Sequence, residues 1–291
     1  MRIQLEWFGA KTAARLADIE QRRVAPVEPR DAATVMVLRP APGTVAPAAA
    51  GRGVEVLMLR RTATMKFAPG AYVFPGGSVD PGDYGAEIGW RGPSPEEFGA
   101  RLGATAEVAR ALVCAAVRVT FEESGVLLAG TQDGSIATPS GPSWEADRAA
   151  LTAGTMTLGE LFGRRGLVLR ADLLVPWTRW ITPEGESRRF DARFFAAALP
   201  DGQEPAGHAA ESDHVAWVRP AAAIEAARSG EMSLLPPTAS TLNDFASAVA
   251  AGGGIAGILG TSRTIVPVQP RLLLKDGEAW LDIPDEAGYP L

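Results

Sequence analysis

Several short stretches of the chain combine apolar and β-branched residues in runs of strand length. AATVMVLRP (32–40) and VEVLMLRR (54–61) predict two strands, plausible hairpin partners across the Pro-, Ala- and Gly-rich residues 40–53. Asp-Gly inside PRLLLKDGEAWLDIP (270–284) predicts a second hairpin near the C-terminus. Further strands are expected over 71–74, 173–182, 188–199 and 214–220.

Helix-forming stretches alternate with these strands. Residues 106–123 form the clearest one, because Thr105 is a good N-cap and Gly125 suits the C-terminal end. Other helices are expected over 7–23, in one or two pieces within 144–165, after residue 220, and over 236–250. Glycines and prolines make 84–104 look irregular, and 131–143 looks like a polar loop. This mixture predicts an α/β (α+β) protein, most simply an α/β/α sandwich with a mixed sheet.

The composition and charge of the chain exclude several classes of function. Net charge is −6 and the pI about 5.2, which argues against a nucleic-acid-binding surface. A single cysteine, Cys114, and two histidines, His208 and His214, exclude a disulfide framework and a cysteine- or histidine-rich metal centre. The uncharged stretch 245–262 is broken by glycines, so a membrane span is not expected. The N-terminus lacks the apolar core of a signal peptide and AGYPL is not a peroxisomal Ser-Lys-Leu address, so a cytoplasmic protein is expected.

Candidate chemistry lies at the end of the 106–123 helix. Arg118 and Glu122 are four residues apart and share a face, and Glu123 is adjacent. Such an arginine can hold one carboxylate while the other meets a hard cation such as Mg²⁺ or Mn²⁺. Taken alone, the pattern is more typical of a solvated helix face. The turn Gly76-Gly77, whose backbone can approach a phosphate or a metal, shifts the balance towards a site.

Together these stretches resemble the Nudix hydrolase signature, Gly-x5-Glu-x7-Arg-Glu-U-x-Glu-Glu-x-Gly-U, where U is bulky and apolar. Gly77 matches its first glycine and Asp83 stands at its first glutamate; the positions that match its end are Arg118, Glu122, Glu123, Gly125 and Val126. Arg118 follows Gly77 by 41 positions instead of 14, so 27 residues are inserted.

A long insert is similar to that of a Nudix subfamily of coenzyme A diphosphatases whose well-known members are peroxisomal; this chain is interpreted as a bacterial homologue. VLMLRRTATMKFAPGAYVFPGG (56–77) and RWITPEGESRRFDARFFAAALP (179–200) also look like that subfamily. We expect an N-terminal helix and linker (1–30), a Nudix domain (31–250) with its insert at about 84–104, and a C-terminal extension (251–291). The insert is expected to be a surface excursion near the site.

The resemblance implies cleavage of coenzyme A or acyl-coenzyme A to 3′,5′-ADP and 4′-phosphopantetheine or its acyl form, with Mg²⁺ or Mn²⁺. It implies Glu122 and Glu123 as metal ligands, Gly76 and Gly77 as backbone contacts to phosphate and metal, and Arg118 as the orienting partner. Arg60 and Arg61 are candidates for binding phosphate, with an ordinary strand-end charge as the alternative. The expected partner is a small nucleotide diphosphate, without nucleic acid or membrane, and a homodimer is left open.

Val119 departs from the signature, which has a glutamate there, usually at or near the metal. Three explanations stay open: a substitute carboxylate, an ion held by fewer protein ligands and more waters, or a non-catalytic nucleotide binder. Asp83 and Glu211 are the candidates for a general base or compensating carboxylate. Their positions in the sequence make Asp80, Glu107 and Asp213 further candidates for the compensating carboxylate.

Other residue types favour plainer interpretations. Trp177, Trp180 and Phe190 could stack a base but are more typical of a core. Cys114 is expected to be buried and inert. A Nudix hydrolase of NADH, ADP-sugars or dinucleotides is the alternative enzyme.

Overall fold

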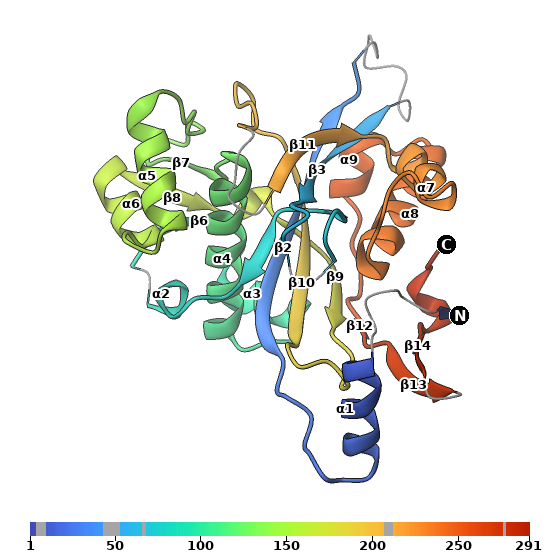
Figure 1. Ribbon diagram of the computed structural model, residues 1–291. Helices are drawn as coiled ribbons and strands as arrows, with labels where there is room; N and C mark the ends of the chain where they lie inside the picture. Colours follow the sequence, from blue (N-terminus) through green and yellow to red (C-terminus); the bar gives the residue numbers. More distant parts are fainter. Residues whose placement is uncertain (4–9, 43–52, 66–67, 86, 207–211, 276–277) are drawn as a thin grey trace.

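The computed structural model describes residues 1–3, 10–42, 53–65, 68–85, 87–206, 212–275 and 278–291. A mixed sheet lies at its centre, with helices on both faces (Figure 1). This confirms the expected α/β class. Among the described residues the sheet has eight strands, in the order β11-β3-β2-β10-β9-β12, with β4 beside β3 and β5 beside β2. Their bounds are β2 (Arg30–Pro40), β3 (Val54–Arg61), β4 (Tyr72–Val73), β5 (Gly76–Ser78), β9 (Val175–Ile181), β10 (Phe190–Ala198), β11 (Ser212–Val218) and β12 (Pro267–Val268).

Two neighbours share one edge of β2. Its last residues pair antiparallel with the start of β3, as the expected hairpin requires, whereas Ala32 to Thr34 pair with β5. The Val35 N–H donates to the Pro75 carbonyl between the two ladders. Strand β5, which contains Gly76 and Gly77, therefore replaces β3 as the neighbour of β2 along this edge.

Alternating residues of β2 build two cores, because successive side chains of a strand point to opposite faces. Ala33, Val35 and Val37 face α4 (Ala106–Ser124), and Met36 and Leu38 face the opposite layer. That layer contains α7 (Pro220–Arg228), α8 (Pro236–Ala250) and α9 (Gly254–Leu259). Trp177 and Trp180 are buried in the second core, so the core interpretation of these tryptophans is confirmed.

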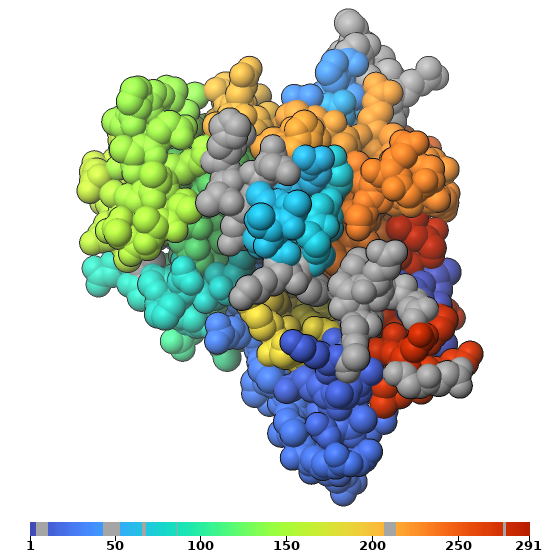
Figure 2. Space-filling model, in the orientation of Figure 1, coloured from blue at the N-terminus to red at the C-terminus, as the bar shows by residue number. Residues whose placement is uncertain are grey.

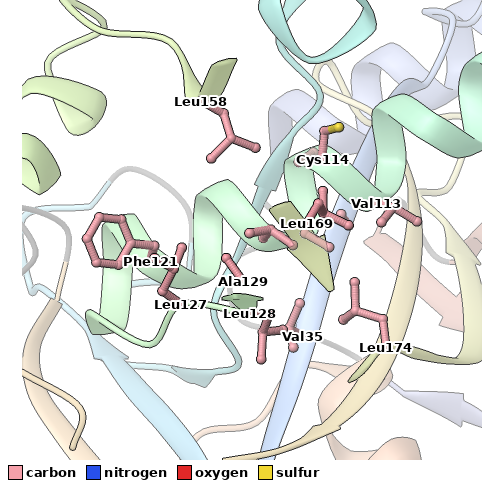
Figure 3. Close-up of a cluster of buried hydrophobic side chains, with 14 of the residues drawn as sticks. Val35, Val113, Cys114, Phe121, Leu127, Leu128, Ala129, Leu158, Leu169 and Leu174 are labelled. Atoms are coloured by element: carbon pink, nitrogen blue, oxygen red, sulfur yellow. The ribbon is translucent and has the colours of Figure 1, made fainter. Parts of the chain in front are cut away.

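A smaller sheet covers the other side of α4. Within the described residues it has three strands, β6 (Gly89–Arg91), β8 (Leu167–Arg170) and β7 (Ala129–Thr131), accompanied by α5 (Pro142–Thr152) and α6 (Leu158–Arg165). Figure 3 shows Val113 and Cys114 of α4 with Leu158, Leu169 and Leu174 from this side of the molecule. Helix α4 is thus enclosed by apolar groups almost all round, the pattern of a central helix.

The insert is not a surface excursion, so that expectation is wrong. After α2 (Pro81–Tyr84) the chain forms β6 and then α3 (Pro95–Leu102), whose Phe98 and Leu102 are buried in the α4 core. Ser94 caps α3 by accepting the Glu97 N–H, and the Glu97 carboxylate accepts the Ser94 N–H. The first turns of α4 complete the insertion.

The two ends of the chain fold together. β1 (Arg2–Ile3) pairs with β14 (Glu278–Asp282), which forms the expected hairpin with β13 (Arg271–Lys275). Helix α1 (Ala10–Glu20) lies against this hairpin, and blue and red segments meet at one end of the molecule (Figure 2). Two short 3-10 turns, Ala171–Leu173 and Asp285–Ala287, also occur in the described parts of the chain. No helix within the described residues is long and apolar enough to cross a membrane.

Candidate active site

The candidate site lies where the C-terminal end of α4 meets β5 and α2. Helix α4 is capped as predicted: the hydroxyl of the N-cap Thr105 accepts the Val108 N–H, and the C-cap Gly125 adopts the left-handed conformation (φ 74°). Its last turns carry Arg118, Glu122 and Glu123 towards the glycine turn.

Arg118 is buried, with 8% of its surface exposed, and this rules out the solvated-face interpretation. Its Nε and Nη2 donate to the two carboxylate oxygens of Asp83 at 3.0 and 2.7 Å, and Nη2 also donates to the Ser78 carbonyl at 2.9 Å. Burial by itself lowers the pKa of the Arg118 guanidinium, but hydrogen bonds and charge from Asp83 outweigh it, so the pKa is raised overall. The guanidinium is therefore a fixed cation.

Asp83 is 1% exposed and both its oxygens are engaged by Arg118. One of them also accepts the Asp80 N–H at 2.8 Å, which closes the single turn of α2. A carboxylate held in this way has little access to water. The placement favours Asp83 as a positioning group and disfavours it as a general base or a substitute ligand.

Glu122 receives Arg118 Nη1 at 3.2 and 3.4 Å, so the predicted i, i+4 pair is present. Desolvation raises the pKa of the Glu122 carboxyl, and the Arg118 charge opposes this without cancelling it. Glu122 is thus more easily protonated than an exposed glutamate.

The Glu123 carboxylate accepts the Gly76 N–H at 3.1 Å, which links the helix to the glycine turn. A Cβ at Gly76 would lie 2.6 Å from Thr34 Oγ1 and 3.0 Å from the Ala33 carbonyl oxygen. Only glycine fits there, and the close approach of the chain at this point is what brings the Gly76 N–H to Glu123.

Val119 lies one turn before Glu123, is 3% exposed and faces Gly77. A Cβ at Gly77 would be 3.1 Å from Val119 Cγ1, so the valine methyl fills the space beside the turn. The glutamate expected by the signature is replaced by an apolar contact, and no described group of three or more His, Cys, Asp or Glu side chains is arranged to hold a metal ion.

The donor set fits a simple ion site better than a carboxylate cluster. Glu122 and Glu123 are adjacent and already oriented, one by Arg118 and the other by the Gly76 N–H. Mg²⁺ is usually held by one or two carboxylates together with substrate phosphates and waters. The residues present therefore fit one largely hydrated ion.

The remaining predicted residues are placed as follows. Arg60 and Arg61 are successive residues of β3, so their side chains point to opposite faces of the sheet; Arg60 is exposed and Arg61 is partly buried. One phosphate therefore cannot be clamped by both from a regular strand. Glu211 lies outside the described residues.

No sequence pattern indicated a role for Arg148, which lies on α5. Its Nε donates to the Glu122 main-chain carbonyl at 3.0 Å, at the end of α4 that carries both glutamates. Neither its spacing nor its neighbours in the chain point to this contact.

Known proteins similar to this chain identify its family. The family model described as the NUDT19 Nudix domain matches residues 94–244. Curated relatives include the acyl-coenzyme A diphosphatase NUDT19 of Gallus gallus, 32% identical over 72% of this chain and 65% of the relative. Another is putative nudix hydrolase 7 of Caenorhabditis elegans, 34% identical over 63% of this chain and 52% of the relative. The chain thus spans about half to two thirds of their lengths.

Among solved structures, a NUDIX hydrolase from Alicyclobacillus acidocaldarius is similar over 82% of this chain and 98% of its own, with 28% identity and a TM-score of 0.64. The family model alone covers more than half of the sequence. The chain therefore belongs to the Nudix hydrolase family, in the group described by the NUDT19 Nudix domain.

Proposed function

We propose that this protein is a divalent-metal-dependent diphosphatase that cleaves coenzyme A or acyl-coenzyme A to 3′,5′-ADP and 4′-phosphopantetheine or its acyl form. The observation that carries the proposal is the bonding of Arg118 to Asp83 and Glu122, beside the Gly76–Glu123 contact. It keeps two carboxylates at the glycine turn despite the long insert. The name acyl-coenzyme A diphosphatase, given to NUDT19 relatives from Gallus gallus and Homo sapiens, supports the substrate class.

In this proposal Glu122 and Glu123 hold the ion, which is Mg²⁺ or Mn²⁺; Nudix hydrolases generally use divalent metals. The bound ion supplies positive charge against the diphosphate oxygens. Arg118 holds Glu122 in place, and the Gly76 N–H orients Glu123. Asp83 acts through Arg118 as a positioning residue.

A net charge of −6 means that attraction for an anionic substrate must be local. Arg61 is the better candidate of the strand-end pair, because it shares the α4 face with Leu57, whereas Arg60 lies on the other face. We keep a cytoplasmic location as a prediction and leave a homodimer open.

The second candidate function is a nucleotide binder without turnover, and Val119 is the observation that favours it. Its methyl occupies the space beside Gly77, and no described group of three or more His, Cys, Asp or Glu side chains is arranged to hold a metal ion. Hydrolysis of NADH, an ADP-sugar or a dinucleotide is the alternative within the enzyme class.

The deciding experiment is turnover by the purified protein of coenzyme A, a short and a long acyl-coenzyme A, NADH, an ADP-sugar and a dinucleotide. Each is titrated with Mg²⁺ and Mn²⁺ and compared with Glu123→Gln, Val119→Glu and the uncharged Val119→Gln. We expect metal-dependent cleavage of the coenzyme A compounds, lost in Glu123→Gln and faster in Val119→Glu than in Val119→Gln. Turnover seen only in Val119→Glu would establish the binder, and preference for another nucleotide would replace the substrate.

A further inference from the structure

Negative charge accumulates at the C-terminal end of α4. The last four carbonyls of a helix lack partners within it, and the aligned peptide dipoles make this end negative. Glu122 and Glu123 add two carboxylates to the same turn. Both the exposed carbonyls and the added charges work against a fixed geometry, so something outside the helix must hold this turn.

Several carbonyls of this last turn accept hydrogen bonds from residues beyond the end of α4. The Phe121 carbonyl accepts the Gly125 N–H at 2.8 Å and the Ser124 carbonyl accepts the Ala206 N–H at 2.9 Å. The Glu122 carbonyl is bonded by a side chain, because it accepts a hydrogen bond from Arg148 Nε at 3.0 Å.

Arg148 is built to reach this point. It is 6% exposed, and its Nη1 pairs at 3.4 Å with Glu145, one turn earlier on α5. A Cβ at Gly125 would lie 3.3 Å from Arg148 Nη1, so the guanidinium sits directly over the glycine that ends α4. An edge-on contact between Phe121 and Trp144, with ring centroids 6.1 Å apart, docks α5 on the same turn.

We propose that Arg148 is a positioning residue for the two glutamates: by bonding the Glu122 carbonyl it fixes the backbone from which both carboxylates project. The inference rests on the proposed function, since it assigns Arg148 a part in the same site. Arg148 contacts the main chain of Glu122 rather than its carboxylate, so its effect on an ion is indirect. A shift of about 1 Å in such groups can reduce turnover by about 100-fold.

The sign of the effect on cation binding separates geometry from charge. Removing a nearby positive charge strengthens the attraction of carboxylates for a cation. Loss of the anchor works the other way, because the carboxylates must then be ordered when the ion binds. Weaker Mn²⁺ binding in an arginine-to-neutral variant is thus a sign of lost positioning.

The test measures Mn²⁺ affinity by titration calorimetry, kcat and KM for acyl-coenzyme A, and Tm. The variants are Arg148→Met, Arg148→Lys, Arg164→Met and Leu151→Ala. Arg164 is the matched charge control, because it bonds Asp147 on α5 at 2.7 Å. Leu151, buried on α5, controls for a general loss of stability.

We expect Arg148→Met to weaken Mn²⁺ binding about fivefold and to lower kcat about tenfold with KM within about twofold. Arg148→Lys can still donate to the Glu122 carbonyl, so it should retain most of the Mn²⁺ affinity and most of kcat. Neither Arg164→Met nor Leu151→Ala should lose Mn²⁺ affinity or kcat to the same extent. Mn²⁺ binding in Arg148→Met equal to or tighter than wild type, or an equal loss in Leu151→Ala, overturns the positioning role alone. A wild-type protein that neither binds Mn²⁺ nor cleaves any diphosphate overturns the proposed function, and the positioning role with it.

Discussion

The Asp83 carboxylate and the Arg118 guanidinium are 35 positions apart in the sequence and form two hydrogen bonds of 3.0 and 2.7 Å. The pair closes the base of the insertion: the chain leaves at α2, forms β6, α3 and the first turns of α4, and returns to Arg118. Because two fixed groups meet in a planar, bidentate geometry, the glycine turn and the carboxylate end of α4 keep their relative position.

Asp83→Asn should destabilise the protein strongly, because it leaves the buried Arg118 without its main counter-charge. Removing one partner of a buried ion pair costs about 3–5 kcal/mol, and we expect about 3 kcal/mol here because Glu122 still pairs with Arg118. Urea denaturation without metal provides the measurement. Asp80→Asn is the matched control: Asp80 lies 3.4 Å from Arg118 but its side chain is 58% exposed, so a change under about 0.5 kcal/mol is expected. Equal losses in the two variants would contradict the assignment.

Gly77→Ala should be rescued by a second substitution. An added Cβ meets the Val119 methyl at 3.1 Å, so Gly77→Ala alone should cost about 1–2 kcal/mol. Val119→Ala removes the obstructing methyl, and a double-mutant cycle should give a favourable coupling of about 1 kcal/mol. Gly76→Ala serves as the comparison, because its Cβ meets Thr34 and the Ala33 backbone, which Val119→Ala leaves in place. Additive effects at positions 77 and 119 would show that the two residues do not touch.

Local signals in the sequence predicted most of the elements near the site. The cap residues Thr105 and Gly125 correctly predicted the two ends of α4. The i, i+4 spacing of Arg118 and Glu122 correctly predicted that their side chains are in contact. Helix α3 was missed although Ser94-Pro95-Glu96-Glu97 is a good helix start, because the glycines and prolines around it suggested a loop.

Pairing between distant segments could not be predicted in the same way. Strand β6 pairs with β8 far along the chain, and β1 with β14 from opposite ends. The contact of Val119 with Gly77 and that of Arg148 with the Glu122 carbonyl also depend on packing between elements. A single sequence carries no periodicity that reports such contacts, so the departure at Val119 was visible while its packing role was not.

Cys114 should react with thiol reagents only when the protein unfolds. It is fully buried in α4, and desolvation raises the pKa of its thiol to about 12. At pH 8 the thiolate population is then roughly 1,000-fold below that of an exposed cysteine. We expect labelling by a disulfide reagent to be negligible in native buffer and rapid in guanidinium chloride. Since Cys114 is the only cysteine, the Cys114→Ser variant has no thiol to label and serves as the negative control. Labelling of the native wild type within minutes would contradict the burial of Cys114.

Glu186→Gln should stabilise the protein at neutral pH but not in acid. Glu186 precedes β10 and faces α1, where the Thr12 hydroxyl donates to it at 3.4 Å. Desolvation raises the pKa of its carboxyl above the ordinary value of a glutamate. Because the folded pKa is the higher one, the folded state binds the proton more tightly, and the wild type loses stability as pH rises through the raised pKa. Glutamine keeps an acceptor for Thr12 without the charge, so the Tm of the Glu186→Gln variant at pH 7.5 should be roughly 1–3 °C higher than that of the wild type, with the gain vanishing below the unfolded pKa.

Glu184→Gln, an exposed change in the same loop, is the control and should leave Tm unchanged both at pH 7.5 and in acid. A gain for Glu186→Gln that is the same at both pH values would mean that the charge of Glu186 is not its cause.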